Sequence, residues 1–335
     1  MKFNTCIVLL LICFGLAPAC PAQTLAYQYF RIGSPADATT SASAGYALMG
    51  GGDDIDEAFR FLCNKAPDGD FLILRARGDD DYNSYVNKLC RLNSVATLVI
   101  PNRQAAQDPK VADVIRHAEA VVIAGGDQAR YINYWQNTPV QDVLNAHIAA
   151  GRPIGGTSAG LAVLGEFIYS AQASAPDDEA LASGQTLVDP YMPRVSVRRD
   201  FLHIPLLNNT LTDTHFAKRD RMGRSLTFLA RIVQDGWSER PREVAVDEKS
   251  AVLLEPDGSA KVVGPGLGAY FIAVREPPKF CRPRTPLTFM NLAVYRAPQG
   301  SSFDLSRWRG AGGVAYTLSV EQGTVHSTQN GGRIY

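Results

Sequence analysis

Short, uniformly apolar segments alternate with amphipathic segments through the first half of the chain, and this alternation restricts the fold more than any other feature. The apolar segments have the length and composition of strands buried on both faces. They are predicted at Tyr46–Met49, Phe71–Leu74, Ala96–Ile100 and Ala120–Ala124. Helices are predicted between and after them, at Ile55–Lys65, Tyr82–Leu92, Val111–His117, Ala129–Trp135 and Val140–Ala150. This order predicts an α/β fold built on a doubly wound, mostly parallel sheet.

The loops that follow these strands are polar or rich in glycine. They are Gly50–Gly52, Arg75–Asp81, Gly125–Gln128 and a turn at Ser158. Ligands of doubly wound sheets bind beyond the carboxyl ends of the strands, so we expect an active site at this edge. The first loop lacks the spacing of a dinucleotide-binding fingerprint, and no Lys-Ser or Lys-Thr pair follows it. No nucleotide is therefore predicted there.

The turn at Ser158 has the composition of a nucleophile elbow. The sequence Gly155-Gly156-Thr157-Ser158-Ala159-Gly160 joins a short apolar stretch to an apolar helical run. The glycines leave room for a tight turn and for the close approach of a substrate. A glycine-rich turn without a catalytic role is the alternative. The strand–turn–helix context favours the nucleophile.

A serine nucleophile needs a base, and the base needs an acid that orients it. Of the 5 histidines, His215 stands apart, because it lies where an apolar stretch meets a basic helix. It is the predicted base. The candidates for the acid are Asp178 and Glu179, in a long polar loop, and Asp213, two residues before the histidine.

The composition excludes several classes of function. The chain of 335 residues carries 33 basic and 33 acidic side chains, so its formal net charge is zero. This balance gives no reason to expect a nucleic acid partner. No Cys-x-x-Cys or His-x-x-x-His spacing suggests a metal site, and we predict no cofactor.

The N-terminus has the pattern of a signal peptide. Residues 1–23 combine Lys2, the apolar run Ile7–Leu16 and small residues suited to cleavage. The same region resembles a lipobox ending at Cys20, so lipidation is the alternative to plain secretion. We expect an exported protein, periplasmic or extracellular. No integral membrane span is predicted.

Two cysteines are candidates for a disulfide in an exported chain. Cys63 and Cys90 lie near the ends of two successive predicted helices. They can pair only if both helices lie on the same face of the sheet.

After Ser158 the pattern changes. We expect the helix after the turn to run over Leu161–Tyr169, a strand-like stretch over Phe201–Leu207, and β-rich sequence from Glu243 onwards. The last residues are rich in glycine and serine, and we expect them to fray.

Several blocks of sequence together resemble a known family. The blocks are Val121–Gln128, Gly155–Gly160 and Asp213–Arg224, with Ala245–Ala251 as a further block. In this order they resemble the serine peptidases of the cyanophycinase and peptidase E family, and the last block resembles the cyanophycinase branch. The likeness covers about Tyr46–Val274. It implies a class I glutamine amidotransferase-like, flavodoxin-like α/β fold, to which the β-rich sequence adds strands toward the C-terminus.

The resemblance implies roles for single residues. Ser158 is implied as the nucleophile and His215 as the base, with an acidic residue of the loop after the nucleophile helix as the third member of a triad. We predict Glu179 for that place, ahead of Asp178 and Asp213, because an apolar pair that can anchor the loop follows it directly.

The remaining site residues are predicted from the same reasoning. The N–H group of Ala159, with one from Gly125 or Gly126, is expected to stabilise the oxyanion. Substrate binding is predicted at Asp127, Gln128, Arg219 and Arg221. Guanidinium groups grip carboxylates in bidentate fashion, and a solvated helix face is the alternative for the arginines.

The sequence therefore predicts a secreted serine peptidase. Its substrate is a peptide or cyanophycin-like molecule cut at peptide or isopeptide bonds next to aspartate. A catalytically silent binding protein on the same scaffold is the alternative, and amide transfer is disfavoured because the elbow carries serine. The predicted parts are a signal peptide at 1–23, a lead-in at 24–45, a hydrolytic domain at 46–275 and a β-rich extension at 276–335. The oligomeric state stays open, a homodimer included.

Overall fold

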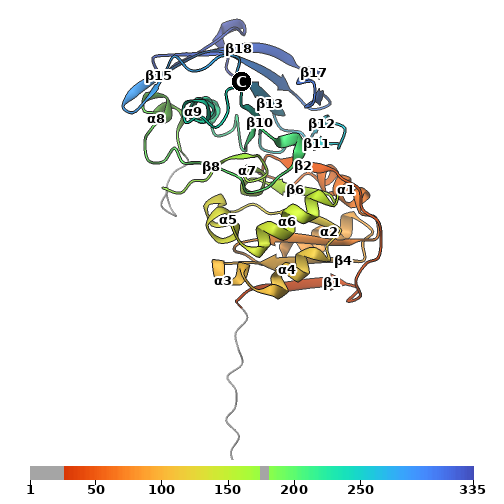
Figure 1. Cartoon of the computed structure of the whole chain (residues 1–335). Coiled ribbons are helices and arrows are strands. Elements are labelled where there is room, and N and C mark those ends of the chain that lie inside the picture. The colour runs from red at the N-terminus through yellow and green to blue at the C-terminus, as the bar shows by residue number, and fades with distance from the viewer. Residues whose placement is uncertain (1–25, 174–180) are drawn as a thin grey trace, which may run out of the picture.

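The computed structural model describes residues 26–173 and 181–335. The predicted signal peptide, Cys20 and the loop carboxylates Asp178 and Glu179 lie outside the described residues. The described chain forms two sheets. The parallel strands of the first lie below most of the second in Figure 1, and the last strands of the first reach into the upper part of the picture.

The first sheet has the predicted parallel strands at its centre. It contains ten strands in the order β1-β4-β3-β5-β6-β2-β11-β12-β16-β17. The parallel strands are β2 (Tyr46–Met49), β3 (Asp70–Arg75), β4 (Ser94–Val99), β5 (Ala120–Ile123) and β6 (Ile154–Thr157). The antiparallel strands are β1 (Gln28–Gly33) at one edge and β11 (Ala251–Leu254), β12 (Ser259–Val263), β16 (Ser302–Asp304) and β17 (Arg309–Ala311) at the other. The predicted α/β class is confirmed, with antiparallel strands added on both sides.

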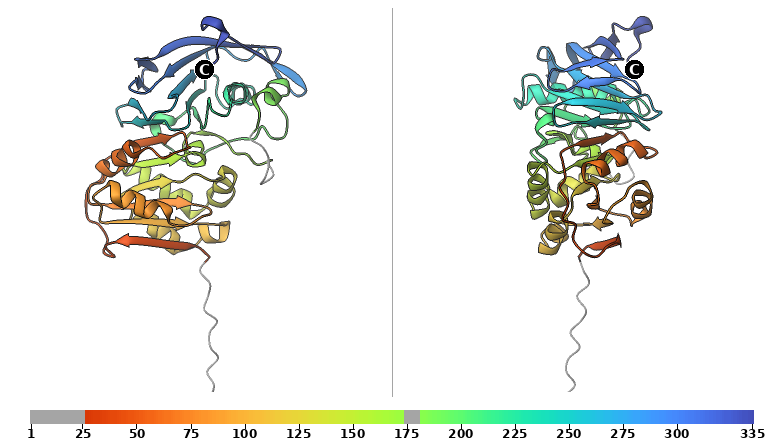
Figure 2. Two further views of the ribbon diagram at one scale, coloured as in Figure 1. Left: turned by 180° about the vertical axis from the view of Figure 1, so that it is seen from behind. Right: turned by 90° about the vertical axis from the view of Figure 1, so that its right-hand side faces the viewer.

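Helices cover both faces of the parallel strands, as Figure 2 shows in its right-hand view. Helices α1 (Asp56–Lys65) and α2 (Asp81–Leu89) pack on one face through Phe59, Leu62 and Val86. The other face is covered by α3 (Arg103–Ala106), α4 (Pro109–Arg116), α5 (Gln128–Trp135) and α6 (Pro139–Ala149). Their apolar stripes explain why the strands between them are buried on both sides.

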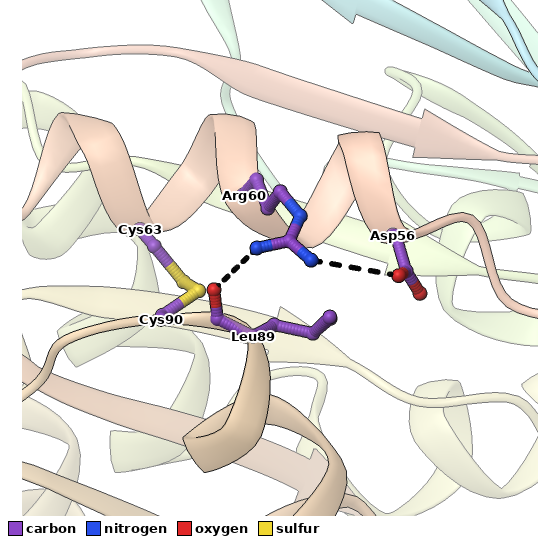
Figure 3. The surroundings of a disulfide bond; sticks show 5 residues. All are labelled: Asp56, Arg60, Cys63, Leu89 and Cys90. Atoms are coloured by element: carbon purple, nitrogen blue, oxygen red, sulfur yellow. Dashed lines mark hydrogen bonds and ion pairs between the residues drawn. A yellow bond between two sulfur atoms is a disulfide. The ribbon is translucent and has the colours of Figure 1, made fainter.

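The disulfide between Cys63 and Cys90 is present, because α1 and α2 lie on the same face. The two Cα atoms are 6.2 Å apart. Figure 3 shows that Arg60 reinforces this link, since its Nη1 donates to the carbonyl oxygen of Leu89 at 2.6 Å, while its Nη2 lies 3.7 Å from Asp56. The end of α2 is thereby tied to α1 both covalently and by a hydrogen bond.

The second sheet was not foreseen as a separate layer. Its order is β19-β18-β15-β13-β10-β9-β7-β8, and β14 pairs with β15. The strands are β7 (Phe167–Tyr169), β8 (Val197–Arg199), β9 (Thr210–Asp213), β10 (Arg242–Val246), β13 (Ala269–Ala273), β14 (Phe280–Arg282), β15 (Thr285–Ala297), β18 (Val314–Glu321) and β19 (Thr324–Ser327). Helices α8 (Ser183–Val188) and α9 (Met222–Gln234) share its apolar core. Strands after residue 276 thus extend both sheets.

Two local predictions after Ser158 are wrong. The helix α7 covers only Ala159–Ala162, and β7 follows instead of the expected helix to Tyr169. Gly165 is a poor helix former and packs closely on the neighbouring strand, since a Cβ there would lie 2.6 Å from the carbonyl oxygen of Thr210. The expected strand over Phe201–Leu207 is an irregular segment ending in a 3₁₀ turn at Pro205–Leu207.

Candidate active site

The turn at Ser158 is a strained junction between β6 and α7. Ser158 has φ 52° and ψ −119°, a left-handed backbone conformation that is costly for a residue with a side chain. Its flanking glycines are required by close packing. A Cβ on Gly156 would lie 2.4 Å from the carbonyl group of Gly160, and one on Gly160 would lie 1.9 Å from the carbonyl oxygen of Ile123. The predicted elbow geometry is therefore present.

Three side chains beside this turn form a continuous chain of hydrogen bonds. The Oγ atom of Ser158 lies 2.6 Å from Nε2 of His215. The Nδ1 atom of the same imidazole lies 2.6 Å from Oε1 of Glu248. Ser158 comes from the first sheet, whereas His215 follows β9 and Glu248 follows β10 of the second sheet. The cluster thus lies where the two sheets meet.

The surroundings of the imidazole fix its protonation. The side chain of His215 is 7% exposed. Burial, assisted by the charges of Arg219 and Arg221, lowers its pKa to about 4. Burial alone would raise the pKa of Glu248, but the hydrogen bond to His215 and the charge of Arg219 leave that pKa below its ordinary value. At neutral pH the carboxylate accepts from Nδ1–H, and Nε2 is free to accept a proton from Ser158.

The acid in this cluster differs from the predicted one. Glu248 accepts the hydrogen bond from Nδ1 of His215, while the predicted Glu179 lies outside the described residues. Asp213 does not contact the imidazole, because its carboxylate is held by Arg224 and by the N–H of Thr214. The block Ala245–Ala251, which contains Glu248, was a signal in the sequence, but nothing local to it pointed to His215.

The predicted oxyanion donors lie around Ser158. Ala159 follows it directly, and a Cβ on Gly125 would lie 3.5 Å from the Cβ of Ser158. The hydroxyl of Tyr131 donates to the carbonyl oxygen of Ala124 at 2.8 Å and lies 3.2 Å from that of Gly125. The N–H of Gly126, in the same planar peptide as the Gly125 carbonyl, therefore points away from this hydroxyl. Within residues 26–173 and 181–335, none of these three N–H groups donates to a backbone carbonyl.

Two of the predicted substrate-binding residues have hydrogen-bond partners within the fold. The Asp127 carboxylate accepts from the N–H of Ala129 at 2.9 Å and so caps α5. The Arg221 side chain is 9% exposed and donates to the carbonyl oxygen and the hydroxyl of Thr214 at 2.9 and 3.0 Å. Arg221 is therefore enclosed by partners within the fold, whereas the side chain of Asp127 is 49% exposed and its binding role stays a prediction.

The other two predicted residues remain accessible. Gln128 is half-buried at the start of α5. The side chain of Arg219 is 46% exposed, and its Nε lies 3.4 Å from Oε1 of Glu248. Arg219 therefore presents a guanidinium group at the rim of the cluster.

The segment that carries His215 is anchored by the end of the described chain. The hydroxyl of Tyr335 accepts from the N–H of Met222 at 2.8 Å and donates to Asp220 at 2.9 Å. Its ring packs edge-on against Phe216, with centroids 6.0 Å apart. The expectation that these last residues fray is therefore wrong.

Residues 26–173 and 181–335 contain no group of three or more His, Cys, Asp or Glu side chains suited to a metal ion. In the same residues, no helix has the length and apolar character needed to span a bilayer.

Comparisons with known proteins show what this chain resembles. Residues 49–193 match the sequence model described as peptidase family S51. The chain is 26% identical over 219 residues to a cyanophycinase of Trichormus variabilis, covering 63% of this chain and 65% of that protein. It is 28% identical over 178 residues to a cyanophycinase of Synechococcus elongatus, covering 52% of this chain and 48% of that protein. The chain thus spans less than two thirds of the length of these relatives. A crystal structure of a putative peptidase E protein from Listeria monocytogenes aligns with a TM-score of 0.44 and 14% identity, over 67% of this chain and 100% of that one.

Proposed function

We propose that this chain is a serine peptidase that hydrolyses peptide or isopeptide bonds next to aspartate, and the match of residues 49–193 to the sequence model of peptidase family S51 supports this proposal. The observation that carries the proposal is the pair of hydrogen bonds, each 2.6 Å long, that join Ser158 to His215 and His215 to Glu248. A nucleophile, a base and an orienting acid in this order define a Ser-His-acid triad.

The geometry supports a two-stage acyl transfer. Oγ of Ser158 attacks the carbonyl carbon, and Nε2 of His215 takes the hydroxyl proton and passes it to the leaving amine. Glu248 holds the imidazole in one tautomer and stabilises its charged form. The N–H groups of Ala159 and Gly126 donate hydrogen bonds to the developing oxyanion and so stabilise it. Water then attacks the acyl-enzyme with His215 again as base, which releases the acid and restores Ser158.

Preference for aspartate is supported by charge at the rim. Arg219 offers a partly exposed guanidinium group, and the neighbouring Lys218 is exposed. Both suit a substrate carboxylate. The relatives that bear the name cyanophycinase point to the same substrate class.

A substrate screen tests the proposal directly. Cyanophycin, β-aspartyl dipeptides and peptides with N-terminal aspartate should be compared with matched asparagine peptides, with Ser158→Ala as the blank. We expect turnover of at least one aspartyl substrate, weak turnover of the asparagine peptides, and labelling of the unchanged chain by a fluorophosphonate. A properly folded chain that neither cuts these substrates nor labels would instead indicate a catalytically silent binding protein.

The buried imidazole makes a prediction about pH. Since the base must be unprotonated, kcat/KM is expected to persist in weak acid and to fall with an apparent pKa near 4. Arg219 lowers the pKa of His215, so Arg219→Gln should move this acid limb to higher pH. The exposed Arg307, which pairs with Asp304, offers a control, and Arg307→Gln should leave the limb in place. Profiles of kcat/KM, each normalised to its plateau, check the prediction. The prediction would be contradicted by an acid limb near pH 6.5 whose apparent pKa is the same in Arg219→Gln.

Export is part of the proposal. The disulfide between Cys63 and Cys90 suits an oxidising compartment, and the signal-like sequence at 1–23 supports the same conclusion. Fractionation of the expressing cells, with mass analysis of the mature N-terminus and of Cys20, decides between secretion, lipidation and retention inside the cell.

A further inference from the structure

The loop after β2 lies among all three segments of the proposed triad. The carbonyl oxygen of Met49 accepts from the N–H of Ser158 at 3.1 Å. The carbonyl oxygen of Gly50 accepts from the N–H of His215 at 2.9 Å, and that of Gly51 accepts from the N–H of Lys249, next to Glu248, at 2.9 Å. Three successive carbonyls therefore bind the backbones of segments that are far apart in the sequence.

Gly51 also contacts the reacting side chains. A Cβ at this position would lie 2.5 Å from Cε1 and 2.6 Å from Nε2 of His215, and 3.0 Å from the Cβ of Ser158. Its φ is +90°, a conformation that glycine adopts without strain. The neighbouring Gly50 is equally enclosed, since its Cβ would lie 2.0 Å from the carbonyl oxygen of Asp247. No other residue type fits at either position without displacing the site.

We propose that Gly50 and Gly51 are positioning residues of the triad, with Gly51 setting the contact between Ser158 and His215. The three carbonyls fix where the triad backbones lie relative to one another. Because Gly51 has no side chain, the imidazole of His215 can come within hydrogen-bonding distance of Ser158. The proposal deepens the proposed function, and its packing part can be tested without any catalytic activity.

The activity test compares two glycines with positive φ. Gly51→Ala adds a methyl group against the imidazole, whereas Gly151→Ala adds one where no atom lies within 4 Å, at φ +70°. Gly151→Ala therefore reports the backbone strain alone. We expect Gly51→Ala to lower kcat and the rate of fluorophosphonate labelling on the order of a hundred-fold, with little change in KM, because displacements of about 1 Å at a reacting centre have such effects. Gly151→Ala should keep both rates.

A stability test examines the packing independently. In a His215→Ala background the methyl group of Gly51→Ala can occupy space left by the imidazole. In the otherwise unchanged chain, we expect Gly51→Ala to lower the melting temperature more than Gly151→Ala does. In the His215→Ala background, we expect this difference between the two variants to be smaller. If Gly51→Ala alone fails to fold, recovery of folding in that background provides the same answer.

The outcomes separate this proposal from the proposed function. Three results would each overturn the positioning role. The first is labelling of Gly51→Ala at the full rate, and the second is an equal loss of rate in Gly51→Ala and Gly151→Ala. The third is a drop in melting temperature from Gly51→Ala that still exceeds the drop from Gly151→Ala by as much in the His215→Ala background. Absence of hydrolysis and labelling in the unchanged chain would overturn the peptidase, while the comparison of melting temperatures would still decide the role of Gly51.

Discussion

Replacement of Glu248 by glutamine is expected to lower kcat on the order of ten-thousand-fold while leaving the fold nearly unchanged. The amide keeps the shape of the side chain but carries no charge. It can neither stabilise the imidazolium that forms when His215 takes the proton nor hold Nδ1–H as the only tautomer. The side chain of Glu248 is 20% exposed and adds little to the apolar core, so the melting temperature should change little.

The matched comparison is Glu179→Gln, which alters the acid that the sequence favoured. Both variants should be assayed on an aspartyl substrate that the unchanged chain cuts, together with thermal melts. We expect Glu179→Gln to retain most of the kcat of the unchanged chain, because Glu248 already accepts the hydrogen bond from Nδ1 of His215. Loss of activity in Glu179→Gln combined with activity in Glu248→Gln would show that the loop carboxylate is the acid during turnover.

Replacement of Arg224 by methionine is expected to destabilise the fold by about 3–5 kcal/mol. The Arg224 and Asp213 side chains are 2% and 3% exposed. Nε of the arginine donates to Oδ2 at 2.9 Å, and Nη2 contacts the other carboxylate oxygen. Methionine fills a similar volume, so the main loss is the partner of a buried carboxylate. Arg221, whose Nη1 lies 3.5 Å from Oδ1, is a weaker substitute.

Asp213 also gives this effect a pH dependence. Burial alone would raise its pKa, but Arg224 and Arg221 hold it below the ordinary value. A carboxyl whose pKa is depressed by folding stabilises the native state above its unfolded pKa, about 3.9, and this stabilisation is lost as the pH falls through the folded pKa. The difference between the unchanged chain and Arg224→Met should therefore be full at neutral pH and shrink in acid, where protonation relieves the unpaired carboxylate.

Denaturant unfolding of Arg224→Met and Arg231→Met, at neutral and acidic pH, checks this prediction. Arg231 lies on the same helix, and its ion pair with Asp235 is partly exposed, at 17% and 23%. Its loss should cost about 1 kcal/mol or less. Equal destabilisation by both variants would mean that the buried pair contributes no more than an exposed one.

The features that could be predicted from the sequence are those that short segments encode. Each central strand carries its own apolar run, so Phe71–Leu74 and Ala120–Ala124 indicated the parallel sheet without knowledge of their neighbours. The elbow at Ser158 is likewise local, because its strained turn requires glycines within two residues of the serine. His215 stood out by its place before a basic helix, and the structure brings it to Ser158.

Contacts between residues far apart in the sequence could be known only from the tertiary structure. Glu248 is 33 residues from His215, and only the parallel pairing of β9 with β10 brings them together. Arg221 has the charge of a ligand-binding residue, but the folded chain buries it against Thr214. Gly51 is one of three glycines in a row, and only the packing of two sheets places it against the imidazole. A local pattern specifies a residue's conformation, whereas its role depends on which distant atoms the folded chain places within about 3 Å.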